Sequence, residues 1–151
     1  YYWFKGAFTP QELVNIEKMT NAIPFEDAVT GEGDNSKISD YRKSRIKWCP
    51  QNQEWAWVYN KLHDYIKEAN DYLNFIVKKE PDNIFAWHLK GISHNRLGET
   101  IFANLSAAEE FLRRRDFKNA KFFAEKVISA TKKFSSENLR ASDIINLINE
   151  I

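Results

Sequence analysis

The chain has 151 residues, 43% of them hydrophobic and 28% charged, which is the composition of an ordinary soluble globular protein. Its formal net charge of +1 gives no overall electrostatic case for binding nucleic acid or an acidic membrane. No stretch approaches the roughly 18 apolar residues of a membrane span, and the single cysteine, Cys49, excludes an internal disulfide.

The first 24 residues predict an aromatic arm and a helix. Residues 1–8 are rich in aromatic side chains, which favours a strand or an extended arm. A helix start follows, because Thr9 can act as the cap, Pro10 suits the first helical position and Glu12 completes a capping box. Pro24 is expected to stop that helix.

Residues 30–40 are polar and contain glycine, which predicts a mobile loop. The loop is acidic, but it lacks the regular ligand spacing and the closing glutamate of an EF-hand, so we expect no calcium there. Polar and apolar side chains then alternate over residues 45–48. This alternation predicts a strand with Ile46 and Trp48 facing inward, ended by Pro50.

A long helix is predicted from Asn52 to about residue 78, because apolar residues recur there at three- and four-residue spacing. The charged turn at 78–81 contains Pro81 and is expected to be a domain boundary. The predicted domains are a small α+β segment with a long C-terminal helix, residues 1–78, and a four-helix stack, residues 79–151.

The four helices of the stack are expected over residues 83–97, 99–114, 117–133 and 137 to the end, the last one capped by Ser136. Short turns between amphipathic helices predict antiparallel neighbours. Small side chains at Ala86, Gly91 and Ala103 should let the first two helices approach closely. Gly98 should close the first helix, because glycine readily takes the left-handed conformation of a helix end.

Trp87, Gly91, Leu97-Gly98 and Ala103 together resemble a tetratricopeptide repeat (TPR), a helical hairpin with Trp, Leu-Gly and Ala at set positions. Asp116-Phe117 looks like the start of the second half of another unit, although the period is imperfect. The expected fold class is therefore mainly α, with a short α+β N-terminal segment followed by a TPR-like antiparallel helical stack. The resemblance implies a surface that binds a protein or peptide.

Residues 81–148 are also similar to the TPR-like helical tail of certain bacterial periplasmic zinc metalloproteases. The similarity is carried by Ala86-Trp87, Arg96-Leu97-Gly98, Ala107-Ala108-Glu109-Glu110, Asp116-Phe117 and Leu139-Arg140-Ala141. In that family the tail accompanies a separate catalytic domain with a His-Glu-x-x-His motif, which this chain lacks. The resemblance implies a docking tail and carries no catalytic residue with it.

Residues 1–75 resemble the N-terminal segment of prolyl-hydroxylase-like 2-oxoglutarate/iron(II) oxygenases from bacteria and phages. The resemblance is carried by Trp3-Phe4, Phe8, residues 23–28, Arg42-x-Ser44-Arg45-x-x-Trp48 and Glu68-Ala69-Asn70. In that family the segment precedes a jelly-roll core with a His-x-Asp…His iron triad and an arginine that binds 2-oxoglutarate. That core is absent here, and His63-Asp64-Tyr65 has tyrosine where the motif needs aspartate.

The histidines and the cysteine form no catalytic or metal-binding pattern, so we expect no catalytic residue, metal or cofactor. His88 and His94 are six residues apart on a helix and do not share a face. His94 occupies a position where such repeats place a packing aromatic, which predicts a partly buried structural histidine. His63 is expected at the surface, and Cys49 is expected to be a buried thiol.

Five residues of the helical stack are predicted to contact a partner, chosen for polarity and helical phase: Asn95, Arg96, Asn104, Arg113 and Lys121. The basic cluster of residues 113–115 with Lys118 and Lys121 could meet phosphate or an acidic peptide. The favoured interpretation is a solvated helix end, whose cations complement the negative pole of the helix dipole.

The first functional hypothesis is a non-catalytic protein- or peptide-binding helical-repeat module, which needs no cofactor. The alternatives are a core-lacking fragment of a 2-oxoglutarate/iron(II) oxygenase, or the accessory tail of a zinc metalloprotease with a separate catalytic domain. A further possibility is that the two halves come from different proteins joined near residues 75–81. The compartment stays open between the cytoplasm and the bacterial periplasm.

Overall fold

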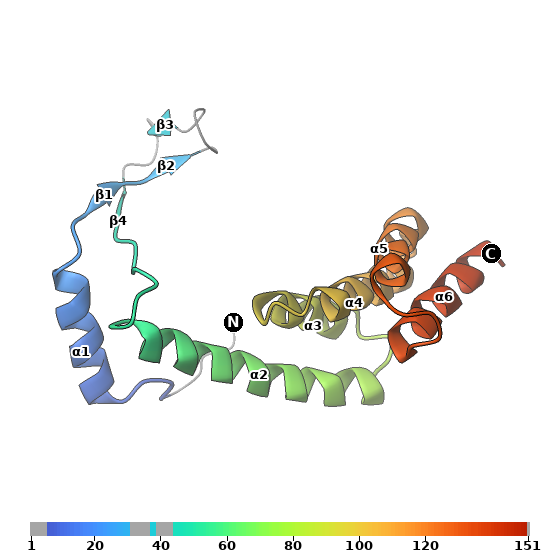
Figure 1. The fold of residues 1–151 in the computed structure, drawn as a ribbon, viewed down its shortest axis with the longest axis horizontal. Helices are drawn as coiled ribbons and strands as arrows, with labels where there is room; N and C mark the ends of the chain where they lie inside the picture. The colour runs from blue at the N-terminus through green and yellow to red at the C-terminus, as the bar shows by residue number, and fades with distance from the viewer. Residues whose placement is uncertain (1–5, 31–36, 39–43, 151) are drawn as a thin grey trace. The chain divides into compact units, whose positions relative to one another are not determined.

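The computed structural model describes residues 6–30, 37–38 and 44–150, and within them it contains six α-helices and four two-residue strands. The prediction of a mainly α fold is therefore confirmed. The chain divides into two compact units, residues 1–56 and 57–151 (Figure 1).

The first unit begins, in its described part, with helix α1 (Pro10–Asn21), and the predicted capping box is present. The backbone N–H of Glu12 donates to Thr9 Oγ1 at 3.2 Å, and the backbone N–H of Thr9 donates to Glu12 Oε2 at 2.7 Å. These two bonds satisfy backbone groups that a helix start would otherwise leave unpaired. Helix α1 ends before Pro24, as predicted.

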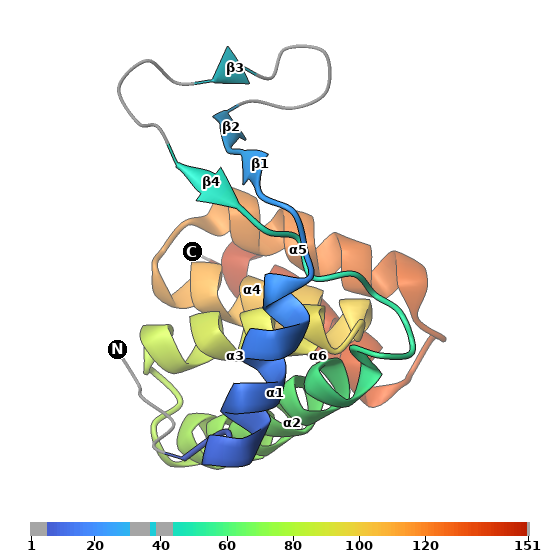
Figure 2. The same cartoon turned by 90° about the vertical axis from the view of Figure 1, so that its left-hand side faces the viewer.

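Four short strands follow, paired two by two (Figure 2). Strand β1 (Glu26–Asp27) is antiparallel to β4 (Arg45–Ile46), with Glu26 opposite Ile46. Strand β2 (Val29–Thr30) is antiparallel to β3 (Lys37–Ile38), with Val29 opposite Ile38. Most of the loop predicted over 30–40, and most of the aromatic arm over 1–8, lie outside the described residues.

Two predictions for the end of this unit are wrong. The Trp48 side chain is 67% exposed and does not face inward, and Cys49 is exposed rather than buried. The reason is that β4 ends at Ile46, and residues 47–50 have no regular secondary structure. The alternation of faces that would have turned Trp48 inward holds only within a strand.

The second unit consists of five helices: α2 (Ala56–Lys79), whose first residue still belongs to the first unit, α3 (Ile84–Arg96), α4 (Thr100–Arg113), α5 (Phe117–Ala130) and α6 (Ser136–Asn149). Helix α4 packs against α3, α5 and α6, and α5 also packs against α6. Residues 97–99 and 114–116 form the short turns on either side of α4. Three helices therefore surround α4, which is the central element of the stack.

The structure places the division between its two units at 56/57, whereas the sequence predicted a boundary at 78/79. The difference arises because the C-terminal half of α2 packs on α3. Leu73 and Val77 of α2 form a buried cluster with Ala86 of α3. Next to this cluster, the Ser93 hydroxyl of α3 donates to Asn70 Oδ1 of α2 at 2.8 Å in a buried hydrogen bond.

The main core lies between α4, α5 and α6. Five of its residues have no solvent exposure, and three of these are alanines: Ala108, Ala124, Val127, Ala141 and Ile144. Small side chains at these positions allow the three helix backbones to approach closely. Larger apolar residues, such as Leu105, Phe123 and Ile148, pack around this centre.

Helix α6 begins one residue earlier than its predicted cap implies. The cap is Ser135, not Ser136, and its hydroxyl oxygen accepts a hydrogen bond from the backbone N–H of Asn138 at 3.3 Å. Two adjacent serines offer the same side chain for this role, so the choice depends on where the preceding turn ends. Asn83 caps α3 in the same way, through the backbone N–H of Ala86.

Gly98 closes helix α3, as predicted, and the helix end is a Schellman motif. The backbone N–H of Gly98 donates to the carbonyl of Asn95, and that of Glu99 donates to the carbonyl of His94 at 2.9 Å. Gly98 has a φ of 75°, in the left-handed region that glycine adopts without steric cost.

Two glycine substitutions are expected to have opposite effects on stability. Gly98→Ala should lower the free energy of unfolding by roughly 1 kcal/mol, because a Cβ is unfavourable at its positive φ. Gly91→Ala should raise it by up to about 1 kcal/mol, because Gly91 lies inside α3, where alanine is the better helix former. An added Cβ there would lie 3.6 Å from Ser106 Cβ, an ordinary contact. Urea unfolding of both variants checks this, and a shift in the same direction for both would contradict it.

Candidate functional site

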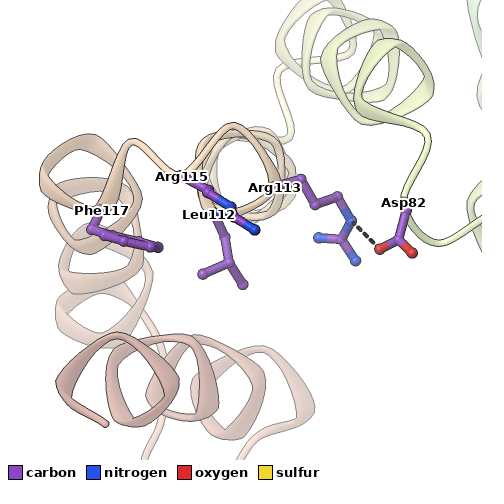
Figure 3. Close-up of a pocket in the computed structure, with 5 residues that line it drawn as sticks. All are labelled: Asp82, Leu112, Arg113, Arg115 and Phe117. Atoms are coloured by element: carbon purple, nitrogen blue, oxygen red, sulfur yellow. Dashed lines mark ion pairs between the residues drawn. The ribbon is translucent and has the colours of Figure 1, made fainter. Parts of the chain in front are cut away.

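The turn between α4 and α5 contributes to an open pocket of about 580 Å³, the candidate site of this chain (Figure 3). Five residues line it: Asp82, Leu112, Arg113, Arg115 and Phe117. Figure 3 shows the Phe117 ring pointing toward Leu112, while Arg113 extends away from them toward Asp82. The pocket therefore combines two apolar side chains, two guanidinium groups and one carboxylate.

Arg113 is held in place by several contacts within the second unit. Its NH1 donates to Glu109 Oε2 at 2.6 Å, and its Nε donates to the backbone carbonyl of Pro81. Nε also forms an ion pair with Asp82 Oδ1 at 3.8 Å. This pair is weak, because the Asp82 side chain is 99% exposed and water screens its charge. Arg113 is thus a fixed wall of the pocket, and its charge is largely neutralised by Glu109.

Trp87 supports this wall from α3. Its indole N–H donates to the Pro81 carbonyl at 2.8 Å, and the Arg113 guanidinium lies 4.9 Å from the ring centroid, in cation–π geometry. The Lys90 ammonium is also 5.0 Å from the ring. Burial lowers the pKa of Lys90, although the charge of Glu109 opposes that change. The tryptophan that led to the TPR resemblance therefore joins α3, α4 and the turn before α3.

Arg115 has an unusual backbone conformation for its residue type. Its φ is 59°, in the left-handed region, and its backbone N–H donates to the carbonyl of Leu112 at 3.0 Å. The next N–H, of Asp116, donates to the carbonyl of Phe111 at 2.9 Å. These are the two hydrogen bonds of a Schellman motif, so Arg115 occupies the position at the end of α4 that Gly98 occupies at the end of α3.

Two adjacent glutamates of α4, Glu109 and Glu110, are buried. Glu109 accepts hydrogen bonds from Arg140 of α6 at 2.6 and 2.9 Å, in addition to the bond from Arg113. Burial by itself would raise the pKa of Glu109, but the hydrogen bonds from Arg140 and Arg113 outweigh it and hold that pKa below its usual range. Glu109 therefore stays charged and ties α6 to α4.

Glu110 is paired in the same manner on the other side of α4. Its carboxylate lies 3.1 Å from His88 Nδ1 of α3 and 2.8 Å from Arg114 NH2. Consequently Arg113 and Arg114 are both neutralised within the chain. The interpretation of this cluster as a solvated helix end is wrong for Arg113, whose side chain is 14% exposed and paired with a buried carboxylate.

Arg115 differs from the two arginines before it. Within the residues that the structure describes, its side chain makes no hydrogen bond and no ion pair, and it is exposed to solvent. The pocket lining thus includes Leu112, Phe117 and an arginine, Arg115, whose charge no described residue neutralises.

The structure places the five predicted partner-binding residues at different positions of the stack. Asn95 and Arg96 are exposed at the end of α3, Asn104 is half-buried in α4, and Lys121 is exposed on α5. Of the five, Arg113 lines the pocket and the other four do not. The sequence placed Arg115 in the basic cluster and Phe117 at a helix start, but neither of them, nor Leu112, was among the residues predicted to contact a partner. One sequence signal could have identified Arg115. It precedes an acidic residue at the end of α4, as Gly98 does at the end of α3.

Two histidines of the second unit, His88 and His94, have structural partners. His94 is 6% exposed, lies 2.6 Å from Glu99 Oε2 through Nδ1, and stacks on Phe102. These contacts agree with its predicted structural role. In the described parts of the chain, no group of three or more His, Cys, Asp or Glu side chains is placed to hold a metal ion. No helix in those parts is long and apolar enough to cross a membrane.

Comparisons with family models, with curated proteins and with solved structures find no match for this chain. The resemblances to tetratricopeptide repeats, to metalloprotease tails and to the N-terminal segment of oxygenases therefore stay predictions.

Proposed function

We propose that the chain is a non-catalytic protein- or peptide-binding module, and that the pocket at the α4–α5 turn receives its partner. One observation carries this proposal: Arg115, whose side chain has no hydrogen bond or ion pair among the described residues, lines a pocket together with Leu112 and Phe117. Protein-binding hot spots combine an apolar anchor position with arginine in this manner.

The pocket is built on rigid elements, which favours binding. Leu112 also packs against the core between α4, α5 and α6, and Arg113 is held by Glu109 and the Pro81 carbonyl. Little conformational entropy is therefore lost when a ligand enters, and more of the contact energy contributes to affinity. The volume of about 580 Å³ would admit one or two side chains of a peptide.

Selection of peptides from a phage-displayed random library, on the immobilised full chain, tests this function. We expect peptides that bind the wild-type chain to bind the Phe117→Ala variant at least about tenfold more weakly, because Phe117 supplies an apolar wall of the pocket. Phe122→Ala is the matched control, since Phe122 is 50% exposed on the same helix and does not line the pocket. No enrichment over an unrelated immobilised protein, or equal losses for the two variants, would contradict the proposal.

A further inference from the structure

We propose that the segment recognised by this pocket carries a side-chain carboxylate next to a bulky apolar residue, and that Arg115 receives the carboxylate at a cost in stability. This inference rests on the proposed function and adds the chemistry of the ligand and the residue that selects it. It follows from the backbone of Arg115, from the pairing of its neighbours and from the lining of the pocket.

The first step is a comparison of two turns within the chain. The ends of α3 and α4 have the same pair of Schellman hydrogen bonds, and the residue with positive φ is Gly98 in one and Arg115 in the other. Glycine adopts this conformation without steric cost, whereas a residue with a Cβ does not. Stability alone would therefore favour glycine at position 115. We infer that the arginine side chain serves a function that offsets its cost in stability.

The second step concerns charge. Arg113 is paired with Glu109 and Arg114 with Glu110, whereas the described part of the chain provides no partner for the guanidinium of Arg115. An anionic ligand group would complete this pairing. Arginine binds a carboxylate through two parallel hydrogen bonds, which gives both energy and orientation.

The third step limits the ligand. Leu112 and Phe117 beside Arg115 require an apolar side chain next to the anionic one, which a peptide segment offers. Asp82, which also lines the pocket, is 99% exposed, and its cationic partner, Arg113, is paired more closely with the buried Glu109. The negative charge of the Asp82 carboxylate is therefore only partly neutralised. That charge would repel a second acidic group. The pocket is therefore suited to one carboxylate beside one apolar residue rather than to a run of acidic residues.

Binding of defined peptides to the full chain tests the ligand chemistry. The probes are fluorescein-labelled Gly/Ser peptides with an amidated C-terminus and a central Phe-Glu pair, compared with the same peptides carrying Phe-Gln, Ala-Glu or a run of glutamates. In fluorescence polarisation the Phe-Glu peptide is expected to bind at least about tenfold more tightly than each of the others. Equal binding of Phe-Glu and Phe-Gln would overturn the inference. Two further probes are the Phe-Gln peptide with a free C-terminus and an amidated peptide with phosphoserine in place of the glutamate. Tighter binding of either one than of the Phe-Glu peptide would also overturn the inference.

Variants at position 115 test the residue. Arg115→Gly should raise the melting temperature by roughly 2–5 °C and weaken binding of the Phe-Glu peptide at least about tenfold. Arg115→Ala should weaken binding equally without raising the melting temperature, because the Cβ is still present. Lys118→Ala, which removes a nearby exposed cation that does not line the pocket, should leave binding within about twofold.

The outcomes separate this inference from the proposed function. Selected peptides that lose binding in Phe117→Ala but not in Arg115→Gly would overturn the role of Arg115 and leave the binding module standing. If the melting temperature falls in Arg115→Gly, the claim that Arg115 lowers the stability of the fold is overturned. If no selected or designed peptide binds the chain, both proposals are overturned.

Discussion

Replacing Glu109 with alanine is expected to lower the free energy of unfolding by about 3 kcal/mol or more, one of the two largest effects that we predict. The Glu109 side chain is 4% exposed and receives hydrogen bonds from Arg113 and Arg140. Its removal leaves Arg113, which is only 14% exposed, without its main counter-charge, and it also breaks the link between α4 and α6. Both losses act on the folded state.

Urea unfolding measures this effect, with Glu125→Ala as the matched control. Glu125 is exposed on α5, so its replacement should change stability by no more than about 0.5 kcal/mol. Arg140→Ala should cost less than Glu109→Ala, because Arg140 is 40% exposed and leaves Arg113 to neutralise Glu109. A loss below about 1 kcal/mol in Glu109→Ala would contradict a structural role for this ion-pair network.

The same carboxylate predicts part of the acid sensitivity of the fold. Since the folded-state pKa of Glu109 lies below that of the unfolded chain, its contribution to stability is fully present above the unfolded pKa. That contribution is lost as the pH falls through the folded pKa, below the ordinary range of a glutamate. Unfolding measured from neutral to acidic pH should therefore show a steeper loss of stability in the wild-type chain than in Glu109→Gln. Parallel profiles would contradict this assignment.

Ile144→Ala is expected to lower the free energy of unfolding by about 2–5 kcal/mol. Ile144 lies on α6, has no solvent exposure and is in contact with the buried core of α4, α5 and α6. Truncation removes apolar contacts and leaves a cavity, because its neighbours Ala108, Ala124 and Ala141 are too small to fill the space.

Leu147→Ala provides the matched control on the same helix. Leu147 is 45% exposed, so we expect its truncation to cost less than about 1 kcal/mol. Urea or thermal unfolding of both variants checks the difference. Similar losses for Ile144→Ala and Leu147→Ala would mean that the face of α6 turned toward the core is not the one that the structure shows.

Local sequence signals predicted the helices of this chain well. The capping box at Thr9 and Glu12 and the helix end at Gly98 both depend on residues within a few positions of one another. The three- and four-residue spacing of apolar residues likewise predicted the long helix and the four that follow it. Where two neighbouring residues could fill the same role, the prediction was off by one residue: Ser136 was expected to cap α6, and Ser135 caps it.

The fold placed other residues in ways that local signals did not indicate. Trp48 and Cys49 were expected to be buried, but a strand that ends at Ile46 leaves them exposed. Conversely, Glu109 reads as a polar residue of an amphipathic helix, yet it is buried because Arg140, 31 positions later, brings a counter-charge from α6.

The candidate site shows the same division. The sequence by itself determined where α4 and α5 begin and end, because capping and periodicity act over one or two helical turns. The pairing of Arg113 with Glu109 and of Arg114 with Glu110 follows the four-residue spacing of neighbours on one helix surface, which is local. Only the tertiary structure decided that both carboxylates are buried, where Arg140 of α6 and His88 of α3 are their other partners. Likewise, the apolar positions of the pocket depend on the packing of α4 against α5 and α6. Such contacts join residues distant in the chain, and no local pattern encodes them.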